Sequence, residues 1–337
     1  MKYDNLPAEY GNVTLNLKDS AAACKILGRS YRNENGLVML WPANAVEFTA
    51  TLEGELILHY SAEENGWLQV FIDGKADNRA RLLASETEAE LLLAQIAPGT
   101  HTVRIVREND IDSNGKLTVW HSLTFRGIAD SVCATKSKAK YIEFVGDSIT
   151  SGKGVMSGER YQRDDPNHSS THSHAYLAAE MLDADYSLVS RGSCGYIRTS
   201  AACPKTMTNM YDYFNPLSAD EALKPYDFPR KPDVIVLSLG TNDAVQGEEF
   251  DNAAKAMVAQ LRERNGEDVK LVMMYGMMSP RHNEDVPRVA EAVGAYSLKV
   301  TQDNSGGRFR EVGTNHPGIE GQKKIAEELT AFLKTIL

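Results

Sequence analysis

Apolar and polar residues in the first 125 positions follow one another in short runs, as in half-buried strands. The predicted strands are 46–50, 56–58, 68–72, 102–106 and 117–125. Asp73-Gly74 predicts a hairpin turn, because glycine accepts the positive φ that such turns require. Pro98-Gly99 predicts a break between the 91–93 run and the next strand. With frequent turns and no clear amphipathic helix, this part is expected to form an N-terminal β-sandwich of the jelly-roll kind.

After Phe125 the period changes, and buried apolar runs alternate with helical stretches. The predicted strands are 141–145, 186–189, 234–239 and 269–275, and the predicted helices are 175–182, 250–264, 286–301 and 321–337. Such alternation predicts a parallel sheet covered by helices on both faces, a three-layer α/β (flavodoxin-like) domain. Ligands of these folds bind beyond the carboxyl ends of the strands, so the residues after each strand are the ones to examine.

A chain of 337 residues exceeds the usual size of one compact core, which favours two domains. We predict a β-sandwich over 1–128, a small, polar and basic linker over 129–139, and the α/β domain over 140–337.

Net charge, apolar runs and cysteine spacing limit the classes of partner and location that we expect. With 36 basic and 46 acidic residues, the net charge of −10 disfavours nucleic acid and anionic membranes as partners. No run approaches the roughly 20 apolar residues that cross a bilayer. The N-terminus lacks the apolar core of a secretory signal, and the four cysteines have no zinc-site spacing. We expect a cytoplasmic protein with free, mostly buried thiols, although a signal removed earlier would leave the same N-terminus.

Four candidate functional residues follow strand ends or precede the last helix. Ser148 lies in a Gly-Asp-Ser turn that can lift a nucleophile out of the sheet, or cap a helix. Gly192 can bring a backbone N–H to a ligand, or only form a turn. The Asn242 amide can donate to an oxyanion, typically worth about 3 kcal/mol, or cap a helix. His316 can act as a general base near neutral pH, or be structural.

The order Gly-Asp-Ser, glycine turn, Gly240-Thr241-Asn242-Asp243 and late His316-Pro317 resembles the SGNH/GDSL hydrolase superfamily over residues 140–337. The resemblance implies that Ser148 is the nucleophile and His316 the base. It implies an oxyanion hole made of the Ser148 and Gly192 backbone N–H groups and the Asn242 side chain. Asp147, Gly240 and Asp243 would support the site structurally.

The first part carries further motifs, namely Gly28-Arg29, Trp41, the run 70–74 and Gly99-Thr100-His101. With these, the chain looks like carbohydrate esterase family 2, whose members join a jelly roll to an SGNH domain and remove acetyl groups from sugars. The resemblance implies an acetylated small molecule or oligosaccharide as substrate, and no cofactor and no metal.

One position departs from the superfamily pattern. The aspartate expected three residues before the histidine is Gly313, followed by Thr314 and Asn315. We therefore predict a Ser148–His316 dyad, with His316 Nδ1 held by a backbone carbonyl or an uncharged side chain. Asp303 or another carboxylate near His316 would contradict this.

Other polar residues are compatible with more than one role. The cluster Asp164, Asp165, His168, His172 and His174 contains metal-ligand residue types, although a polar loop before the next helix is the expected role. Arg191, His172 and Asn315 are candidates for the substrate rim, with solvent exposure as the ordinary alternative for Arg191. Cys194 lies near Gly192, but its surroundings in sequence suggest no lowered thiol pKa.

Two rival functions remain open from the sequence. A lipid or thioester hydrolase would use the same residues, although the chain shows no apolar lid. A carbohydrate-binding protein with an impaired second domain would explain the missing aspartate.

Overall fold

A computed structural model describes residues 9–19, 23–110, 116–157, 165–197, 203–217, 224–277, 281–300 and 316–337. The chain divides into two compact units. The first unit consists of Met1–Met39, Ala45–Arg107 and Leu117–Ser137, and the second of Leu40–Asn44, Glu108–Lys116 and Lys138–Leu337. The second unit thus takes two short segments that lie inside the 1–128 range predicted for the β-sandwich.

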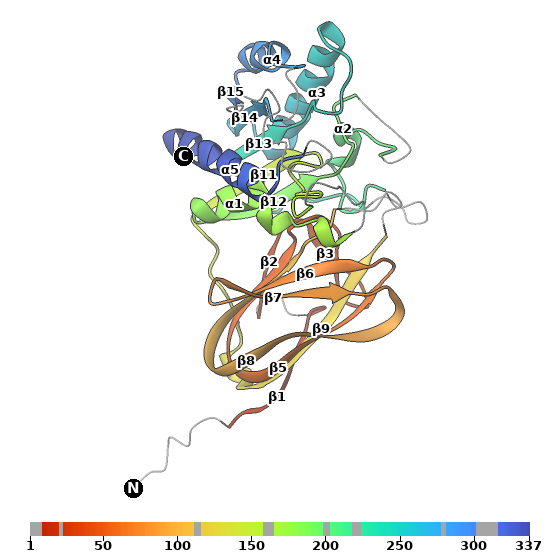
Figure 1. Cartoon of the computed structure of the whole chain (residues 1–337), viewed down its shortest axis with the longest axis vertical. Helices are drawn as coiled ribbons and strands as arrows, with labels where there is room; N and C mark the ends of the chain where they lie inside the picture. The colour runs from red at the N-terminus through yellow and green to blue at the C-terminus, as the bar shows by residue number, and fades with distance from the viewer. Residues whose placement is uncertain are drawn as a thin grey trace. The chain divides into compact units, whose positions relative to one another are not determined.

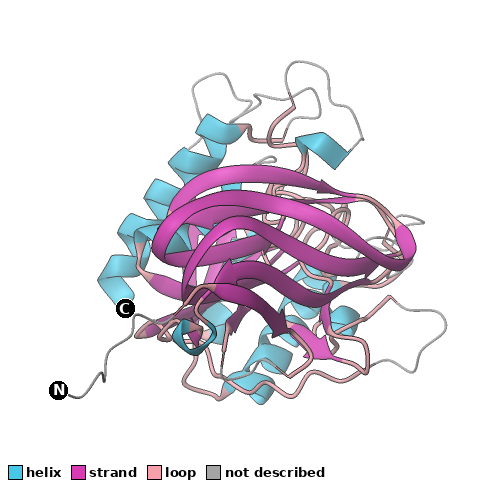
Figure 2. Ribbon diagram, turned by 90° about the horizontal axis from the view of Figure 1, so that it is seen from below, coloured by secondary structure: helices cyan, strands magenta, loops and turns pink. Residues whose placement is uncertain are grey.

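The first unit is a jelly-roll β-sandwich built from antiparallel strands (Figure 1), as the sequence predicts. Its described strands are β1 (Gly11–Asn16), β2 (Lys25–Leu27), β3 (Ser30–Arg32), β4 (Leu37–Met39), β5 (Ala45–Ala62), β6 (Gly66–Ile72), β7 (Lys75–Leu82), β8 (Ser85–Arg107), β9 (Thr118–Gly127) and β10 (Cys133–Ala134). They join in the order β3-β4-β9-β5-β8-β6-β7, with β1 on β9 and both β2 and β10 on β5. The strands curve strongly (Figure 2).

Two predicted breaks in this unit are wrong. β5 runs unbroken through both predicted strands, and β8 continues through Pro98-Gly99. At that point the pairing moves from Leu52 opposite Gly99 to Gly54 opposite Ile96. This shift is a bulge, which absorbs a proline because its missing N–H is then not needed in the ladder. The Asp73-Gly74 turn is confirmed, since both residues have positive φ, 51° and 75°.

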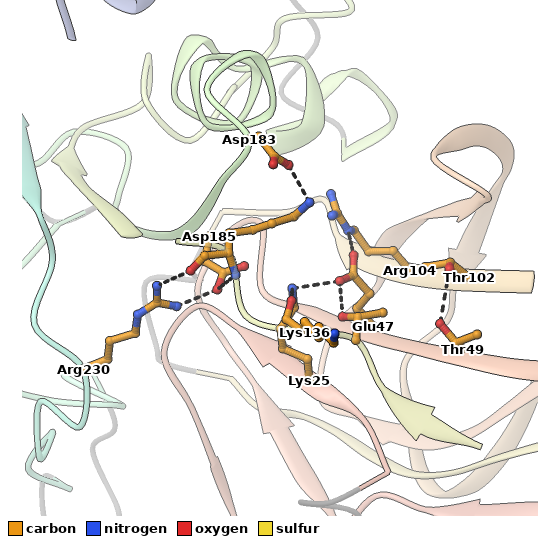
Figure 3. A network of polar contacts seen from close by, with 11 residues as sticks. Lys25, Glu47, Thr49, Thr102, Arg104, Lys136, Asp183, Asp185 and Arg230 are labelled. Atoms are coloured by element: carbon orange, nitrogen blue, oxygen red, sulfur yellow. Dashed lines mark hydrogen bonds and ion pairs between the residues drawn. The ribbon is translucent and has the colours of Figure 1, made fainter. Parts of the chain in front are cut away.

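A buried carboxylate ties the start of β5 to its neighbours (Figure 3). Glu47 lies 2.9 Å from Lys25 Nζ and also accepts hydrogen bonds from Arg104 and Thr135. Burial opposes its ionisation, but Arg104, Thr135 and Lys25 together lower the pKa of Glu47 to about 2. Since β10 pairs with β5 and Thr135 donates to Glu47, part of the predicted linker is built into the first unit.

The second unit contains a five-stranded parallel sheet of order β12-β11-β13-β14-β15, counted over the described residues. Its strands are β11 (Lys140–Gly146), β12 (Ala184–Ser190), β13 (Val234–Ser238), β14 (Lys270–Tyr275) and β15 (Tyr296–Lys299). Its helices are α1 (His174–Met181), α2 (Met207–Met210), α3 (Glu248–Asn265), α4 (Asp285–Val293) and α5 (Ile319–Ile336). Short 3-10 turns are η1 (Ala129–Ser131) in the first unit and η2 (Asp165–Asn167) and η3 (Ser170–His172) in the second.

Strands β12 and β13 are buried at every residue, which requires cover on both faces of the sheet. Helix α1 packs with α5, and α3 with α4 (Figure 1). The three-layer α/β prediction is confirmed. In the described part of the chain, no helix is long and apolar enough to cross a membrane.

The predicted helix 286–301 is correct only in its first half. α4 ends at Val293, where Gly294 adopts the left-handed conformation with φ 65°. Glycine at this position commonly ends a helix, because it has no Cβ to clash there. The chain then forms the edge strand β15, which pairs with β14.

Hydrogen bonds explain why two short segments cluster with the second unit. Trp41 Nε1 donates to the Phe214 carbonyl at 2.9 Å, and Ala43 N–H donates to Ser170 Oγ at 3.1 Å. The Glu108 carbonyl accepts from Ser170 N–H, and its carboxylate accepts from Thr171 Oγ1. The contacts of Ala43 and Glu108 are all with residues of η3.

Candidate active site

The turn after β11 carries Ser148. Gly146 ends the strand, and a Cβ there would lie 2.1 Å from Thr150 Oγ1, so only glycine fits. Ser148 is 7% exposed, and its Oγ lies 2.8 Å from His316 Nε2. His316 immediately precedes the Pro317-Gly318 start of α5. The two predicted catalytic side chains, 168 residues apart in sequence, are therefore in hydrogen-bond contact.

Asp147 is fully buried beneath this turn. Its Oδ1 accepts the Ile149 N–H at 2.9 Å, which is the local tie that fixes the turn. Burial raises the pKa of Asp147 to about 7, and the Asp243 and Asp110 carboxylates add to this rise. The hydrogen bonds from Ile149 and Thr241 act in the opposite direction and lower it. Near neutral pH this carboxyl group is thus close to half-protonated.

Asn242 follows β13 and points its amide at the same turn. Nδ2 donates to the Cys194 carbonyl at 2.8 Å and to Asp147 Oδ2 at 3.3 Å. Its neighbour Asp243 accepts the Tyr196 and Ile197 N–H groups at 2.9 and 3.0 Å. Gly240 has φ 108°, which allows the strand to turn into this loop. Asp147, Gly240 and Asp243 thus lie where structural supports would be needed.

Gly192 is placed beside the site, but its N–H already has a partner. It donates to Asp110 Oδ2 at 2.7 Å. A Cβ on Gly192 would lie 2.8 Å from that oxygen and 3.1 Å from Lys153 Nζ. A carboxylate thus occupies one of the predicted oxyanion donors. The Ser148 backbone N–H, by contrast, has no acceptor among the described residues.

The expected solvent exposure of Arg191 is wrong. The residue is 4% exposed, and its Nη1 donates to the Gly192 carbonyl at 2.6 Å. Arg191 therefore stabilises the glycine turn from within and does not form a rim. His172 is partly exposed at the end of η3, where its Nδ1 lies 2.7 Å from Ser169 Oγ.

The expectation that the Cys194 thiol has no lowered pKa is confirmed. A hydrogen bond with Cys203 and burial raise the pKa of the Cys194 thiol well above its ordinary value. The same hydrogen bond lowers the pKa of Cys203 to about 7. Both Sγ atoms also contact the Lys205 carbonyl, at 3.8 and 3.2 Å.

Some sequence candidates fall outside the described residues, namely Asp164, Asp303, Gly313, Thr314 and Asn315. The group that holds His316 Nδ1 stays a prediction. His174 is buried, with Nδ1 at 2.8 Å from Gln322 Oε1, and burial lowers its pKa to about 4. Within the described ranges, no group of His, Cys, Asp and Glu side chains is arranged to hold a metal ion.

Sequence reasoning missed three residues of this region. Asp110 lies in a loop with no motif, and Gln322 lies in α5, where its Nε2 donates to the Ile149 carbonyl at 2.9 Å. His282 contacts the Asp243 carbonyl at 3.0 Å from a loop after β14. No local pattern marks them, because each acts on a partner far away in sequence.

Comparison with known proteins gives a family match and several relatives. Residues 144–322 match the GDSL-like Lipase/Acylhydrolase family, which spans more than half of the chain. Cellulase/esterase CelE of Acetivibrio thermocellus is 27% identical over 326 residues, covering 91% of this chain and 38% of CelE. An acetylxylan esterase / glucomannan deacetylase of Cellvibrio japonicus is 26% identical over 209 residues, covering 60% of this chain and 55% of that protein.

Among solved structures, a family two carbohydrate esterase from Clostridium thermocellum, in complex with cellohexaose, superposes with a TM-score of 0.80. It is 21% identical and covers 93% of this chain and 98% of that one. The resemblance inferred from the sequence is thus confirmed at the level of fold. The chain spans only 38% and 55% of the length of the two curated relatives.

Proposed function

The chain belongs to the GDSL-like Lipase/Acylhydrolase family, and from this premise we propose that it is a serine esterase that removes acetyl groups from carbohydrates. The observation that carries the proposal is the 2.8 Å contact between Ser148 Oγ and His316 Nε2 at the carboxyl end of a parallel sheet. A hydroxyl within hydrogen-bond reach of an imidazole is the arrangement that activates a serine nucleophile.

The reaction proceeds by acyl transfer. Ser148 Oγ bonds to the acetyl carbonyl carbon while its proton moves to His316 Nε2. The bond from that carbon to the sugar oxygen then breaks, and the proton passes from His316 to the leaving oxygen. Water repeats both steps on the acetyl-serine and releases acetate. The chain supplies no acid at Gly313, so Ser148 and His316 act as a dyad in this proposal.

The oxyanion forms beside three donors, of which one is open. The Ser148 N–H has no acceptor among the described residues. Asn242 must redirect one hydrogen, and its 3.3 Å bond to Asp147 is the longer of its two. For the Gly192 N–H to donate to the oxyanion, its hydrogen bond to Asp110 must break. Donors aimed at a developing oxyanion are typically worth about 3 kcal/mol each.

An acetylated oligosaccharide is the proposed substrate class. The names of two relatives support it, since one is named a cellulase/esterase and the other an acetylxylan esterase / glucomannan deacetylase. The solved complex of a similar fold with cellohexaose supports it as well. The same proposal places His172 and Asn315 at the rim of the substrate site.

Substitution of the nucleophile tests the chemistry. Ser148→Ala is expected to reduce hydrolysis of p-nitrophenyl acetate to background, because no other group can form the acyl-enzyme. Ser122→Ala on β9 is the matched control and is expected to leave the rate unchanged. Acetate release from acetylated mono-, oligo- and polysaccharides then tests the substrate class. Full activity in Ser148→Ala would contradict the assignment of Ser148 as the nucleophile.

Two rivals are separated by simple measurements. A preference for butyryl and longer esters over acetyl esters would favour the lipid or thioester hydrolase. Failure of a fluorophosphonate to label Ser148, together with no acetate release and retained glycan binding, would favour a carbohydrate-binding protein.

A further inference from the structure

A second histidine is buried close to the predicted oxyanion donors. His282 lies between β14 and α4 and is 6% exposed. Its Nδ1 is 2.9 Å from Asp285 Oδ2, and its Nε2 is 3.0 Å from the Asp243 carbonyl oxygen. The ring stacks on Phe250 with centroids 4.0 Å apart and an interplanar angle of 13°. Both ring nitrogens therefore face oxygen atoms.

Asp285 is an acceptor in this arrangement. Its Oδ1 receives the Arg288 Nη2–H at 2.5 Å and the Gly247 N–H at 3.3 Å. Burial opposes its ionisation, but the hydrogen bonds from His282, Arg288 and Gly247 hold the pKa of Asp285 below its ordinary value. With two donors on Oδ1 and its pKa held low, Asp285 is an ionised carboxylate and has no proton to offer, so His282 Nδ1 must donate to Oδ2.

The other nitrogen meets the same condition. A backbone carbonyl can only accept a hydrogen bond, so His282 Nε2 must donate as well. An imidazole that donates from both nitrogens carries a proton on each and is an imidazolium. The facing aromatic ring of Phe250 is compatible with this charge, since a cation is attracted to the face of an aromatic ring. The other charged groups nearby are Arg281, Arg288 and Asp251.

The Asp243 carbonyl connects this cation to the predicted oxyanion hole. It also accepts the Arg281 Nη1–H at 2.9 Å, so two cationic donors hold one carbonyl. Asp243 directly follows Asn242, and its carboxylate is fixed by the Tyr196 and Ile197 N–H groups. A cavity of about 20 Å³ lined by Gly240, Thr241 and His282 lies against the loop. The two hydrogen bonds to the Asp243 carbonyl therefore contribute to holding the loop.

We propose that His282, as an imidazolium held between Asp285 and the Asp243 carbonyl, is the positioning residue for Asn242. The proposal rests on the function proposed above, in which Asn242 donates to the oxyanion. His282 contacts neither Ser148 nor substrate in this proposal, and acts only through the loop. Its effect is expected on kcat and not on KM, because an oxyanion donor acts in the transition state.

Two substitutions separate the two bonds. An asparagine amide lies near the position of histidine Nδ1, and a glutamine amide near that of Nε2. His282→Asn keeps the bond to Asp285 and loses the bond to Asp243, so kcat for an acetyl ester should fall about tenfold to a hundredfold, the cost of a small misplacement. His282→Gln keeps the bond to Asp243 and should retain most of kcat. His121→Asn in β9, whose Nδ1 contacts the Asn35 carbonyl, is the control and should match the wild type.

Nitrogen-15 NMR of the wild-type full chain tests the charge without any variant. The proposal expects protonated-type shifts and attached protons on both His282 nitrogens at neutral pH. A neutral ring with one bare nitrogen would overturn it. Equal losses of kcat in His282→Asn and His282→Gln, or no loss in His282→Asn, would overturn it as well. A wild type that cleaves no acyl ester defeats the proposed function instead, while the NMR result still decides the state of His282.

Discussion

At the scale of single residues, Asp147 gives the nucleophile turn an unusual pH dependence. Its pKa of about 7 in the fold lies above the ordinary value of 3.8. Between about pH 4 and pH 7 the native state holds a proton that the unfolded chain has released. The free energy of unfolding must then fall as pH rises through this window, by up to about 1.4 kcal/mol per pH unit from this one group.

Asp147→Asn, which has no proton to lose, is expected to flatten that slope. Denaturant unfolding of the variant and the wild type at several values between about pH 5 and pH 8 measures it. Parallel pH profiles for the two proteins would show that Asp147 keeps an ordinary pKa.

Asp110 is the other residue-scale test, because it accepts the hydrogen bond of the Gly192 N–H, one of the proposed oxyanion donors. A hydrogen bond to a carboxylate is stronger than one to a neutral oxygen. Asp110→Asn keeps the shape but loses the charge, so the N–H should be released more easily to substrate. We expect kcat for an acetyl ester to rise by about fivefold with KM unchanged, because an oxyanion donor acts in the transition state, and fivefold corresponds to roughly 1 kcal/mol. An unchanged or lower kcat would contradict this role.

At the scale of elements, the loops after β12 and β13 are in close contact through Gly195 and Asp243. A Cβ on Gly195 would lie 2.4 Å from Asp243 Oδ1. Gly195→Ala therefore must displace the carboxylate from the Tyr196 and Ile197 N–H groups. We expect a loss of about 2–3 kcal/mol in the free energy of unfolding and a lower kcat.

The matched control for Gly195→Ala is Gly11→Ala at the start of β1, where a Cβ would meet nothing within 4 Å. Its stability should change by less than about 0.5 kcal/mol. Denaturant unfolding of both variants gives the comparison. Equal free energies of unfolding for the two variants would mean that the Asp243 carboxylate can move without loss of stability.

At the scale of the whole molecule, the second unit is not one continuous piece of chain. It includes Leu40–Asn44 and Glu108–Lys116. A fragment of residues 138–337 would lack the partners of Phe214, Ser170 and Thr171. It would also lack Asp110.

We therefore expect that fragment to unfold at a lower temperature than the full chain and to hydrolyse acetyl esters poorly, since buried groups left without hydrogen bonds typically cost about 1–3 kcal/mol each. Thermal unfolding and kcat of the purified fragment measure this. A fragment as stable and active as the full chain would show that the two inserted segments contribute nothing.

The sequence by itself determined the two fold classes, the carboxyl ends of β11, β12, β13 and β14, and the residues that follow them. Period-2 and period-3.6 patterns are local, and the Gly-Asp-Ser and Gly-Thr-Asn-Asp turns are read directly from the chain. The order of the parallel sheet could be expected to bring Ser148, Asn242 and His316 together, because the carboxyl ends of parallel strands share one edge.

Only the tertiary structure decided what those residues touch. It placed a carboxylate from Asp110 on the Gly192 N–H, buried Arg191 where solvent was expected, and set His282 against Asp243. It also carried β8 through Pro98-Gly99, where a bulge opposite β5 absorbs the proline. The physical reason is the same in each case. Hydrogen bonds and burial depend on partners distant in sequence, whereas periodicity and turn chemistry depend on neighbours.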